Sequence, residues 1–238
     1  MIGQGVLREC LLDPDIERVV AVGRSAVGNV HPKLKNAVAK DLFDLSPIEQ
    51  ELTDLDACFF CLGVTSAGMS EPAYTRITHD LTVSVAETLL RLNPGMGIVF
   101  VSGTGTDSTE RGRVMWARVK GKAENALLRM PFKWACMFRP GFIQPMHGIK
   151  SRTALYRIPY TLMSPFTPFL RRAFPNAVTT TETLGRAMIS VAKKGYPTTY
   201  LETRDINIAG GLGARQSGSR AEATTKSTND TKDTKHTK

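Results

Sequence analysis

The sequence lacks any hydrophobic run close to the roughly 18 residues that a membrane-spanning helix needs. Its amino end also lacks the charged and then apolar pattern of a secretory signal. Hydrophobic residues make up 42% of the chain and charged residues 22%, which argues against a disordered, collagen-like or coiled-coil protein. The 238 residues suffice for one good-sized core, or two at most. We therefore expect a soluble, cytoplasmic protein without a transmembrane segment.

Cysteine is also scarce, with four residues in the chain. Cys58 and Cys61 have the spacing of a zinc or redox pair, but they lie in an apolar run that reads as a buried strand. Residues three apart on a strand point to opposite faces. A zinc site also needs two further ligands at matching spacing, and the sequence has no second pair. We predict small buried thiols and no metal.

Positive charge exceeds negative charge, with 31 Lys and Arg against 22 Asp and Glu and a net charge of +9. Part of the excess lies in residues 213–238, where the only hydrophobic residues are alanines. Such a segment cannot bury enough apolar surface to fold, so we predict a disordered tail over residues 211–238. Basic residues elsewhere are scattered, and we expect no specific nucleic-acid partner. Salt-dependent nucleic-acid binding by the tail is the alternative.

Apolar runs alternate with helical patterns along the first 140 residues. Helices are predicted over residues 3–12, 72–92, 114–130 and 182–194, and from a capping box at Ser46 onward. Strands are predicted at residues 18–22, 37–40, 58–62, 97–102, 134–138 and 206–208. This alternation is typical of an α/β protein with a parallel sheet that helices cover on both faces.

Glycines, hydroxyls and charges follow the predicted strands. In open parallel sheets, ligands bind outside the carboxyl ends of the strands. The five ends are Gly23-Arg24-Ser25, Asp41-Leu42, Gly63-Val64-Thr65, Ser102-Gly103-Thr104 and Arg139-Pro140-Gly141-Phe142. Turns are often rich in Gly and Ser, but five such ends together favour a backbone-lined groove for an extended polar ligand.

Three segments resemble one family. They are Ser-Gly-Thr-Gly-Thr at 102–106, Trp-Ala-Arg-Val-Lys-Gly-Lys-Ala-Glu at 116–124 and Phe-Arg-Pro-Gly-Phe-Ile at 138–143. Together they resemble the atypical short-chain dehydrogenase/reductases, closest to the NAD(P)-binding, epimerase-like proteins related to the Tat-interacting-protein oxidoreductases. The resemblance implies a Rossmann-type, doubly wound parallel sheet over residues 1–210. Residues 140–210 would be its small C-terminal substrate or lid part.

The resemblance also implies catalytic residues. The family pairs a Tyr with a Lys one helical turn later, and the Lys holds the cofactor ribose and lowers the pKa of the phenol. Lys120 matches the Lys, but Trp116 occupies the Tyr position, and an indole cannot act as a general acid. Ser102 matches the hydroxyl that orients a substrate carbonyl. The proton would then come from Thr104 through water, from Tyr74 or from the substrate.

In the family, the residues at the end of the second strand decide whether NAD or NADP is preferred. NAD-specific sites place Asp or Glu there, whereas this chain has Arg24 and Ser25, which suit a 2′-phosphate. We predict NADP, with NAD as the alternative. The resemblance further assigns contacts with the adenine, the adenosine ribose and the nicotinamide, in that order: Asp41 and Leu42, Gly63, and Pro140 with Phe142.

The amino end departs from the family. The family begins with an apolar strand and a Gly-x-x-Gly-x-x-Gly turn that binds the cofactor pyrophosphate, and only Gly3 matches the last glycine of that turn. That strand lies at the centre of the sheet in the order 3-2-1-4-5-6. We therefore expect a truncated N-terminus and a sheet that lacks its first strand. The alternative is a variant sheet that has a gap or borrows a strand.

These features predict an NAD(P)-dependent oxidoreductase that acts on an unidentified small molecule with a carbonyl or hydroxyl group. Residues 154–174 are apolar and end near two arginines, as a substrate lid would. The alternative function is an NADPH-binding sensor or scaffold that has lost its chemistry, and Trp116 is the residue that favours it. The chain could be a monomer or a homodimer.

Overall fold

The computed structural model describes residues 1–149 and 176–211. The predicted lid at 154–174 and the predicted tail beyond Gly211 lie outside the described residues. In chain order the elements are α1 (Ile2–Leu12), β1 (Val19–Gly23), β2 (Leu34–Val38), η1 (Ser46–Leu52), β3 (Ala57–Phe60), α2 (Glu71–Thr75), η2 (Arg76–Asp80), α3 (Leu81–Leu92), β4 (Gly97–Val101), α4 (Met115–Arg129), β5 (Ala135–Arg139), β6 (Phe142–Gln144), β7 (Val178–Thr180), α7 (Thr181–Lys194), β8 (Tyr200–Glu202) and α8 (Thr203–Ala209).

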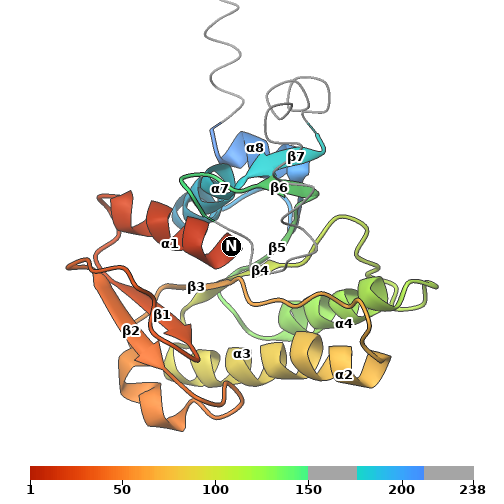
Figure 1. Ribbon diagram of the computed structural model, residues 1–238, viewed down its shortest axis with the longest axis horizontal. Helices are drawn as coiled ribbons and strands as arrows, with labels where there is room; N and C mark the ends of the chain where they lie inside the picture. The colour runs from red at the N-terminus through yellow and green to blue at the C-terminus, as the bar shows by residue number, and fades with distance from the viewer. Residues whose placement is uncertain (150–175, 212–238) are drawn as a thin grey trace, which may run out of the picture.

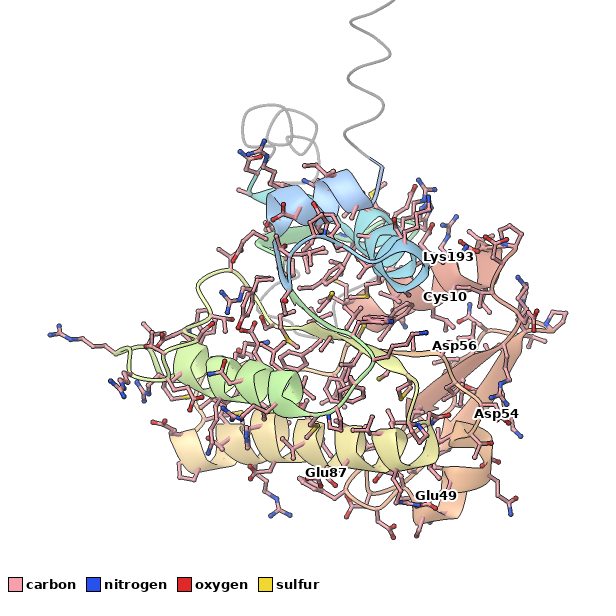
Figure 2. The ribbon with its side chains drawn as sticks, turned by 180° about the vertical axis from the view of Figure 1, so that it is seen from behind. Cys10, Glu49, Asp54, Asp56, Glu87 and Lys193 are labelled. Carbon is pink, nitrogen blue, oxygen red and sulfur yellow. The ribbon has the colours of Figure 1, made fainter. Side chains whose placement is uncertain are left out.

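Every strand pair in the described residues is parallel. The strands form a four-stranded sheet in the order β3-β4-β5-β8 and two separate pairs, β1-β2 and β6-β7. Helices α2, α3 and α4 cover one face, and α1 and α7 lie on the other (Figure 1). Figure 2 shows the same layers from behind, with Cys10 and Lys193 on the side of α1 and α7 and Glu87 on the opposite side. The predicted parallel α/β architecture is confirmed.

Strand β4 forms the centre of the core because all five of its residues are buried. Ile98 and Phe100 pack into the cluster beneath α3 and α4, whereas Val99 and Val101 pack into the cluster beneath α1 and α7. A parallel strand covered on both faces needs apolar side chains on both, which explains its continuous hydrophobic run. Gly97 is required at its start, since a Cβ there would lie 1.9 Å from the Trp134 ring.

Three local predictions are wrong. Residues 206–208 lie in helix α8, and the strand comes earlier as β8, because a capping box of Glu202 and Asp205 begins the helix at Thr203. Strand β2 begins at Leu34 and ends at Val38, earlier than the predicted range. Ser46 does not cap η1 but donates its hydroxyl to Asp44 at 2.6 Å.

Helix α1 is held mainly by α7. The two helices approach closely at glycines, because a Cβ on Gly5 would lie 2.6 Å from Thr181 Cβ and one on Gly185 would lie 2.8 Å from Glu9 Cγ. The buried Glu9 carboxylate accepts from Arg186 Nε on α7 at 3.1 Å. Lys193 near the end of α7 pairs with Asp13 just after α1. Backbone contact and ion pairs together fix α1 against α7.

The close approach of α1 and α7 can be tested with two glycines of the same helix. Gly5→Ala and Gly3→Ala gain the same helix propensity, but only Gly5→Ala clashes with Thr181, whereas a Cβ on Gly3 meets Cys61 Cβ at an ordinary 3.5 Å. We expect Gly5→Ala to be less stable than Gly3→Ala by about 2 kcal/mol, the typical cost of overpacking. Urea unfolding of both variants measures this difference. Equal midpoints would show that the two helices can separate freely.

Candidate functional site

The carboxyl ends of β1, β2 and β3 carry exposed apolar side chains. Val22, Val38, Leu62 and Val64 are 44%, 42%, 37% and 42% exposed. They differ from scattered surface residues because they lie at the ends of three parallel strands or directly after them. In open α/β folds, ligands bind at the carboxyl edge of the sheet. At the ends of β1, β2 and β3, this edge carries exposed apolar side chains.

The residues predicted to contact the adenosine part lie at this edge. Arg24 and Ser25 are exposed directly after β1. Gly63 is exposed after β3, and a Cβ there would meet nothing within 4 Å, so its backbone faces open space. Asp41 is exposed and accepts the Phe43 N–H at 2.9 Å, whereas Leu42 is half-buried against the cluster beneath η1.

A buried carboxylate organises the ends of β4 and β5. Glu124 on α4 is 0% exposed. It accepts a short hydrogen bond from the Ser102 hydroxyl at the end of β4. The same carboxylate binds Arg139 at the end of β5 in a bidentate ion pair, with Nε donating at 3.0 Å. Ser102 is itself buried. Its hydroxyl therefore points into the protein, towards Glu124.

Arg139 is held from several sides. Its guanidinium lies 4.4 Å from the centre of the Tyr200 ring and donates to Ser108 Oγ. Its Nη1 lies 3.8 Å from Glu202 Oε1. Hydrogen bonding to Glu124 raises the pKa of Arg139 above its ordinary value. This arginine is consequently a fixed positive charge between the sheet and α4.

Lys120 also points towards the end of β4. Its Nζ donates to the Ser102 carbonyl oxygen at 3.0 Å and lies 5.8 Å from the centre of the Phe100 ring. Burial lowers the pKa of this ammonium to about 8, although the neighbouring Glu124 carboxylate opposes the shift. Lys120 thus lies at the carboxyl end of β4, and its hydrogen bonds go to backbone carbonyls.

The other predicted catalytic groups, Trp116, Thr104 and Tyr74, differ in their exposure to solvent. Trp116 is half-buried, and its Cη2 lies 3.6 Å from where a Cβ on Gly105 would be, so the indole lines the loop after β4. Thr104 is exposed in that loop and its Oγ1 donates to the Arg139 carbonyl at 3.0 Å. Tyr74 is only 2% exposed and lies within the core.

Three further predicted residues lie near this edge. Pro140 is buried, and its carbonyl accepts the Thr104 N–H at 3.0 Å, which closes the loop after β4 onto the end of β5. Phe142 begins β6 and is half-buried. Gly3, in the first turn of α1, lies against Cys61 just after β3.

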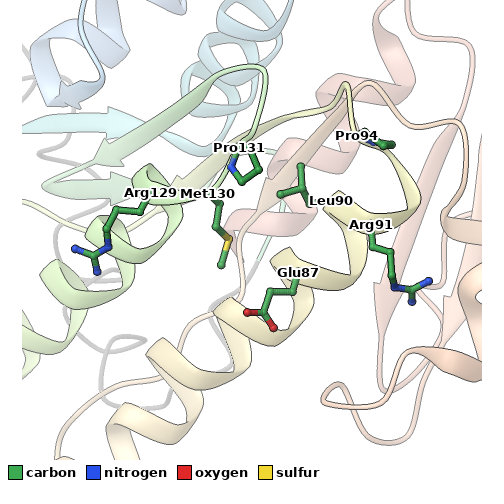
Figure 3. Close-up of a pocket in the computed structure, with 7 residues that line it drawn as sticks. All are labelled: Glu87, Leu90, Arg91, Pro94, Arg129, Met130 and Pro131. Carbon is green, nitrogen blue, oxygen red and sulfur yellow. The ribbon is translucent and has the colours of Figure 1, made fainter.

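A separate surface groove of about 600 Å³ lies at the other end of the sheet (Figure 3). Its lining includes Pro94 and Pro131, which precede β4 and β5. It is therefore at the amino edge, away from the residues above. Within residues 1–149 and 176–211, no cluster of His, Cys, Asp or Glu could hold a metal ion. No helix in that part of the chain is long and apolar enough to cross a membrane.

Sequence reasoning missed Glu124 and Arg139 as the organising pair, although both lie in the segments that carry the resemblance. The available signal was the spacing of Lys120 and Glu124, one helical turn apart, on a helix with alanine, valine and glycine on its buried side. Charged side chains that face a sheet need buried hydrogen-bond or ionic partners. Arg139, the last residue of a buried strand, has the charge opposite to that of Glu124.

Removing the buried carboxylate should destabilise the protein strongly. Glu124→Gln keeps the shape of the side chain but leaves the Arg139 guanidinium without its counterion, and breaking such a pair costs about 3 kcal/mol. Glu71→Gln is the control, because its pair with Arg118 is solvent-exposed and contributes less than about 1 kcal/mol. Urea unfolding at neutral pH measures both. Similar losses for the two variants would contradict the role of Glu124.

The pKa of Lys120 predicts a pH-dependent stability. Between pH 8 and the ordinary value of 10.5, the unfolded state binds more protons at this residue than the folded state, so this contribution to stability rises with pH. Between these two pH values, the free energy of unfolding of the wild type should rise by on the order of 2 kcal/mol more than that of Lys120→Met. The free energy of unfolding of both proteins is measured from pH 7 to pH 10. The buried thiols are the same in the two proteins, so their titration cancels in the difference. A difference independent of pH would show that the ammonium is not desolvated.

No protein-family model matches the chain. One curated relative, "Protein fmp52, mitochondrial" of Emericella nidulans, is 25% identical over 150 residues, which are 60% of this chain and 63% of the relative. The chain thus spans less than two thirds of the length of that relative.

Solved structures share the fold. MoeE5 in complex with UDP-glucuronic acid and NAD is 17% identical, with a TM-score of 0.59 over 84% of this chain and 71% of that chain. The Bordetella bronchiseptica enzyme WbmH in complex with NAD+ is 15% identical, with a TM-score of 0.56 over 81% and 68%. A short-chain dehydrogenase from Burkholderia cenocepacia in complex with NADP is 16% identical, with a TM-score of 0.54 over 93% and 92%. The chain therefore shares the Rossmann-like α/β fold of these structures.

Proposed function

We propose that the protein is an NADP-preferring oxidoreductase of the atypical short-chain dehydrogenase class, acting on a small molecule with a carbonyl or hydroxyl group. The observation that carries this proposal is the shared edge of the strands. Exposed apolar side chains lie at or after the ends of β1, β2 and β3. The exposed Thr104 hydroxyl lies in the loop after β4, and Lys120 on α4 places its desolvated ammonium at the end of the same strand. An extended ligand with an apolar ring at one end and a reactive ring at the other matches this order.

The residues present fit a dinucleotide. Val38 and Leu62 offer an apolar surface to an adenine, and Asp41 offers a carboxylate oxygen to its exocyclic amine. Gly63 leaves its backbone open to a ribose. The exposed Arg24 guanidinium and Ser25 hydroxyl suit a 2′-phosphate, whose charge a planar guanidinium binds in two hydrogen bonds. The relatives in complex with NAD or NADP support the same class of cofactor.

Thr104 is the hydroxyl best placed to hold a substrate oxygen. A bound nicotinamide would supply or accept the hydride. The Ser102 hydroxyl is committed to Glu124, whereas Thr104 Oγ1 is exposed and lies 3.4 Å from Glu202 Oε2. Burial raises the pKa of the Glu202 carboxyl, despite the opposing Arg139 guanidinium. In alcohol oxidation, Thr104 would receive the substrate proton as its own passes to Glu202.

A sensor or scaffold that binds NADPH without chemistry is the second candidate. Two observations favour it: the indole of Trp116 lines the loop where a phenol is expected, and the Lys120 ammonium bonds to backbone carbonyls. Both leave a binding groove without the usual acid. In either case the sheet that lacks its first strand, the substrate lid at 154–174, the cytoplasmic location and the choice between monomer and homodimer remain proposals from the sequence.

Nucleotide titration tests the proposal. We expect NADPH to bind more tightly than NADH, and Arg24→Ala to weaken NADPH binding about tenfold by removing a charge-assisted contact while NADH binding is unchanged. Arg129→Ala, an exposed arginine in the groove of Figure 3, is the control and should change neither. Tryptophan fluorescence reports binding. The absence of binding by either nucleotide would refute both functions.

Activity assays on the same proteins distinguish an enzyme from a sensor. Oxidation of NADPH with a panel of aldehydes and ketones identifies turnover, and Thr104→Val should then lower kcat at least tenfold while leaving nucleotide affinity unchanged. Tight NADPH binding without turnover, both in the wild-type protein and in Trp116→Tyr, would support the sensor.

A further inference from the structure

The Lys120 amine has only uncharged hydrogen-bond partners. Its Nζ donates to the carbonyl oxygens of Ser102, at 3.0 Å, and Val101, at 3.5 Å. Its other neighbour is the Phe100 ring, whose centre lies 5.8 Å away. In the part of the chain that the structure describes, Lys120 forms no ion pair. A charged ammonium at this position therefore lacks a counterion in direct contact.

The carboxylate of Glu124, one helical turn further along α4, is bonded to other groups. Its Oε1 accepts from the Ser102 hydroxyl and from Arg139 Nε, and its Oε2 accepts from Arg139 Nη2. A guanidinium stays protonated in proteins, so Arg139 neutralises this carboxylate at every ordinary pH. Burial is consequently the larger effect on Lys120 and lowers its pKa to about 8, although Glu124 opposes the shift.

An amine in these surroundings is a nucleophile at neutral pH. With a pKa of about 8, roughly a quarter of it is unprotonated at pH 7.5, against roughly one part in a thousand for a lysine with the ordinary pKa of 10.5. Desolvated lysines of this kind form imines with carbonyl compounds. An unprotonated imine carries no charge and needs no counterion. It therefore suits these neutral partners better than an ammonium does.

The fold holds this amine at the carboxyl edge of the sheet. The Lys120 side chain is half-buried and reaches the end of β4, so it is not sealed inside the core. Gly121 fixes the helix against the loop after β4, because a Cβ there would lie 1.8 Å from the Asp107 carbonyl oxygen. Trp116 lies one turn earlier on the same face of α4 and lines that loop. The surroundings thus favour an apolar or aromatic electrophile.

We propose that Lys120 is a covalent binding site for small aldehydes, which form an imine with its Nζ. The lone pair of the nitrogen attacks the carbonyl carbon, a C–N bond forms, and the carbonyl oxygen takes up a proton. The C–O bond of this carbinolamine then breaks with loss of water, the nitrogen gives up its last proton, and a C=N bond remains. Amine and aldehyde thus give imine and water, without an oxidant or a reductant.

An imine on Lys120 would remove the ammonium that the family resemblance assigns to the cofactor ribose. Reactive aldehydes would therefore compete with the nucleotide for the end of β4. Only this competition rests on the proposed function. The burial of Lys120 and its neutral partners belong to the chain itself, so imine formation requires no bound nucleotide.

Reductive trapping without nucleotide tests the site. The protein is treated with benzaldehyde and cyanoborohydride, which reduces an imine to a stable secondary amine. Cleavage after glutamate releases residues 111–124, in which Lys120 and Lys122 are the only lysines. Lys122 is exposed on the same helix and is the internal reference. At pH 7.5 we expect Lys120 to be labelled at least fivefold faster than Lys122. The ratio should fall towards pH 10, where exposed lysines lose their protons.

The same labelling in guanidinium chloride shows whether the fold is responsible, and there the ratio should be close to one. A native ratio of one or less, or equal ratios with and without denaturant, would overturn the proposal. A native ratio that stays constant up to pH 10 would also overturn it, because the preference would then reflect access and not an unprotonated amine. No nucleotide is present, so failure here leaves the cofactor proposal standing, and absence of NADPH binding leaves the aldehyde site standing.

Discussion

The site depends on one buried charge, the Glu124 carboxylate. It lies on α4 and holds the side chains that end β4 and β5, Ser102 and Arg139. A carboxylate without water is tolerated only with its counterion and hydrogen bonds in place, so α4 cannot shift along the sheet without leaving a charge unpaired. Lys120 is one turn away on the same helix and is thereby brought to the end of β4. The Glu124–Arg139 pair thus positions the residues at the ends of β4 and β5.

This constraint also explains the electrostatics of Lys120. In a Tyr–Lys pair, the ammonium is stabilised by the phenolate that it helps to form. Trp116 provides no such charge, and burial lowers the pKa of Lys120 in spite of the opposing Glu124 carboxylate. The carbonyl oxygen of Ser102 supplies a hydrogen bond but no full charge. In the proposed function, a ribose hydroxyl would be a further neutral acceptor, and Lys120 would position the ligand without activating an acid.

The sequence was sufficient for the architecture because the buried strands are strong local signals. The apolar run of β4 and the glycine at its start follow directly from burial on both faces. It was not sufficient where polar side chains decide the outcome. Ile206 and Ile208 have the composition of a strand, yet the capping box of Glu202 and Asp205 makes the segment helical. Likewise Ser102 matched a substrate-binding hydroxyl by position, and only the location of Glu124 shows that it points inward.

Within the described residues, the strands at the proposed ligand-binding edge are not all joined by backbone hydrogen bonds. The residues suited to adenosine follow β1, β2 and β3, whereas those suited to chemistry follow β4 and β5. Within the described residues, no backbone ladder joins β1-β2 to the other strands; the contacts are side-chain packing and the hydrogen bonds of Arg18 to the Thr53 and Asp54 carbonyls before β3. Side-chain packing resists separation less specifically than a ladder of backbone hydrogen bonds, because it fixes no register. A ligand that contacts both parts would therefore hold them together. Its binding free energy would add to the stability of the folded state, which would couple affinity to fold stability.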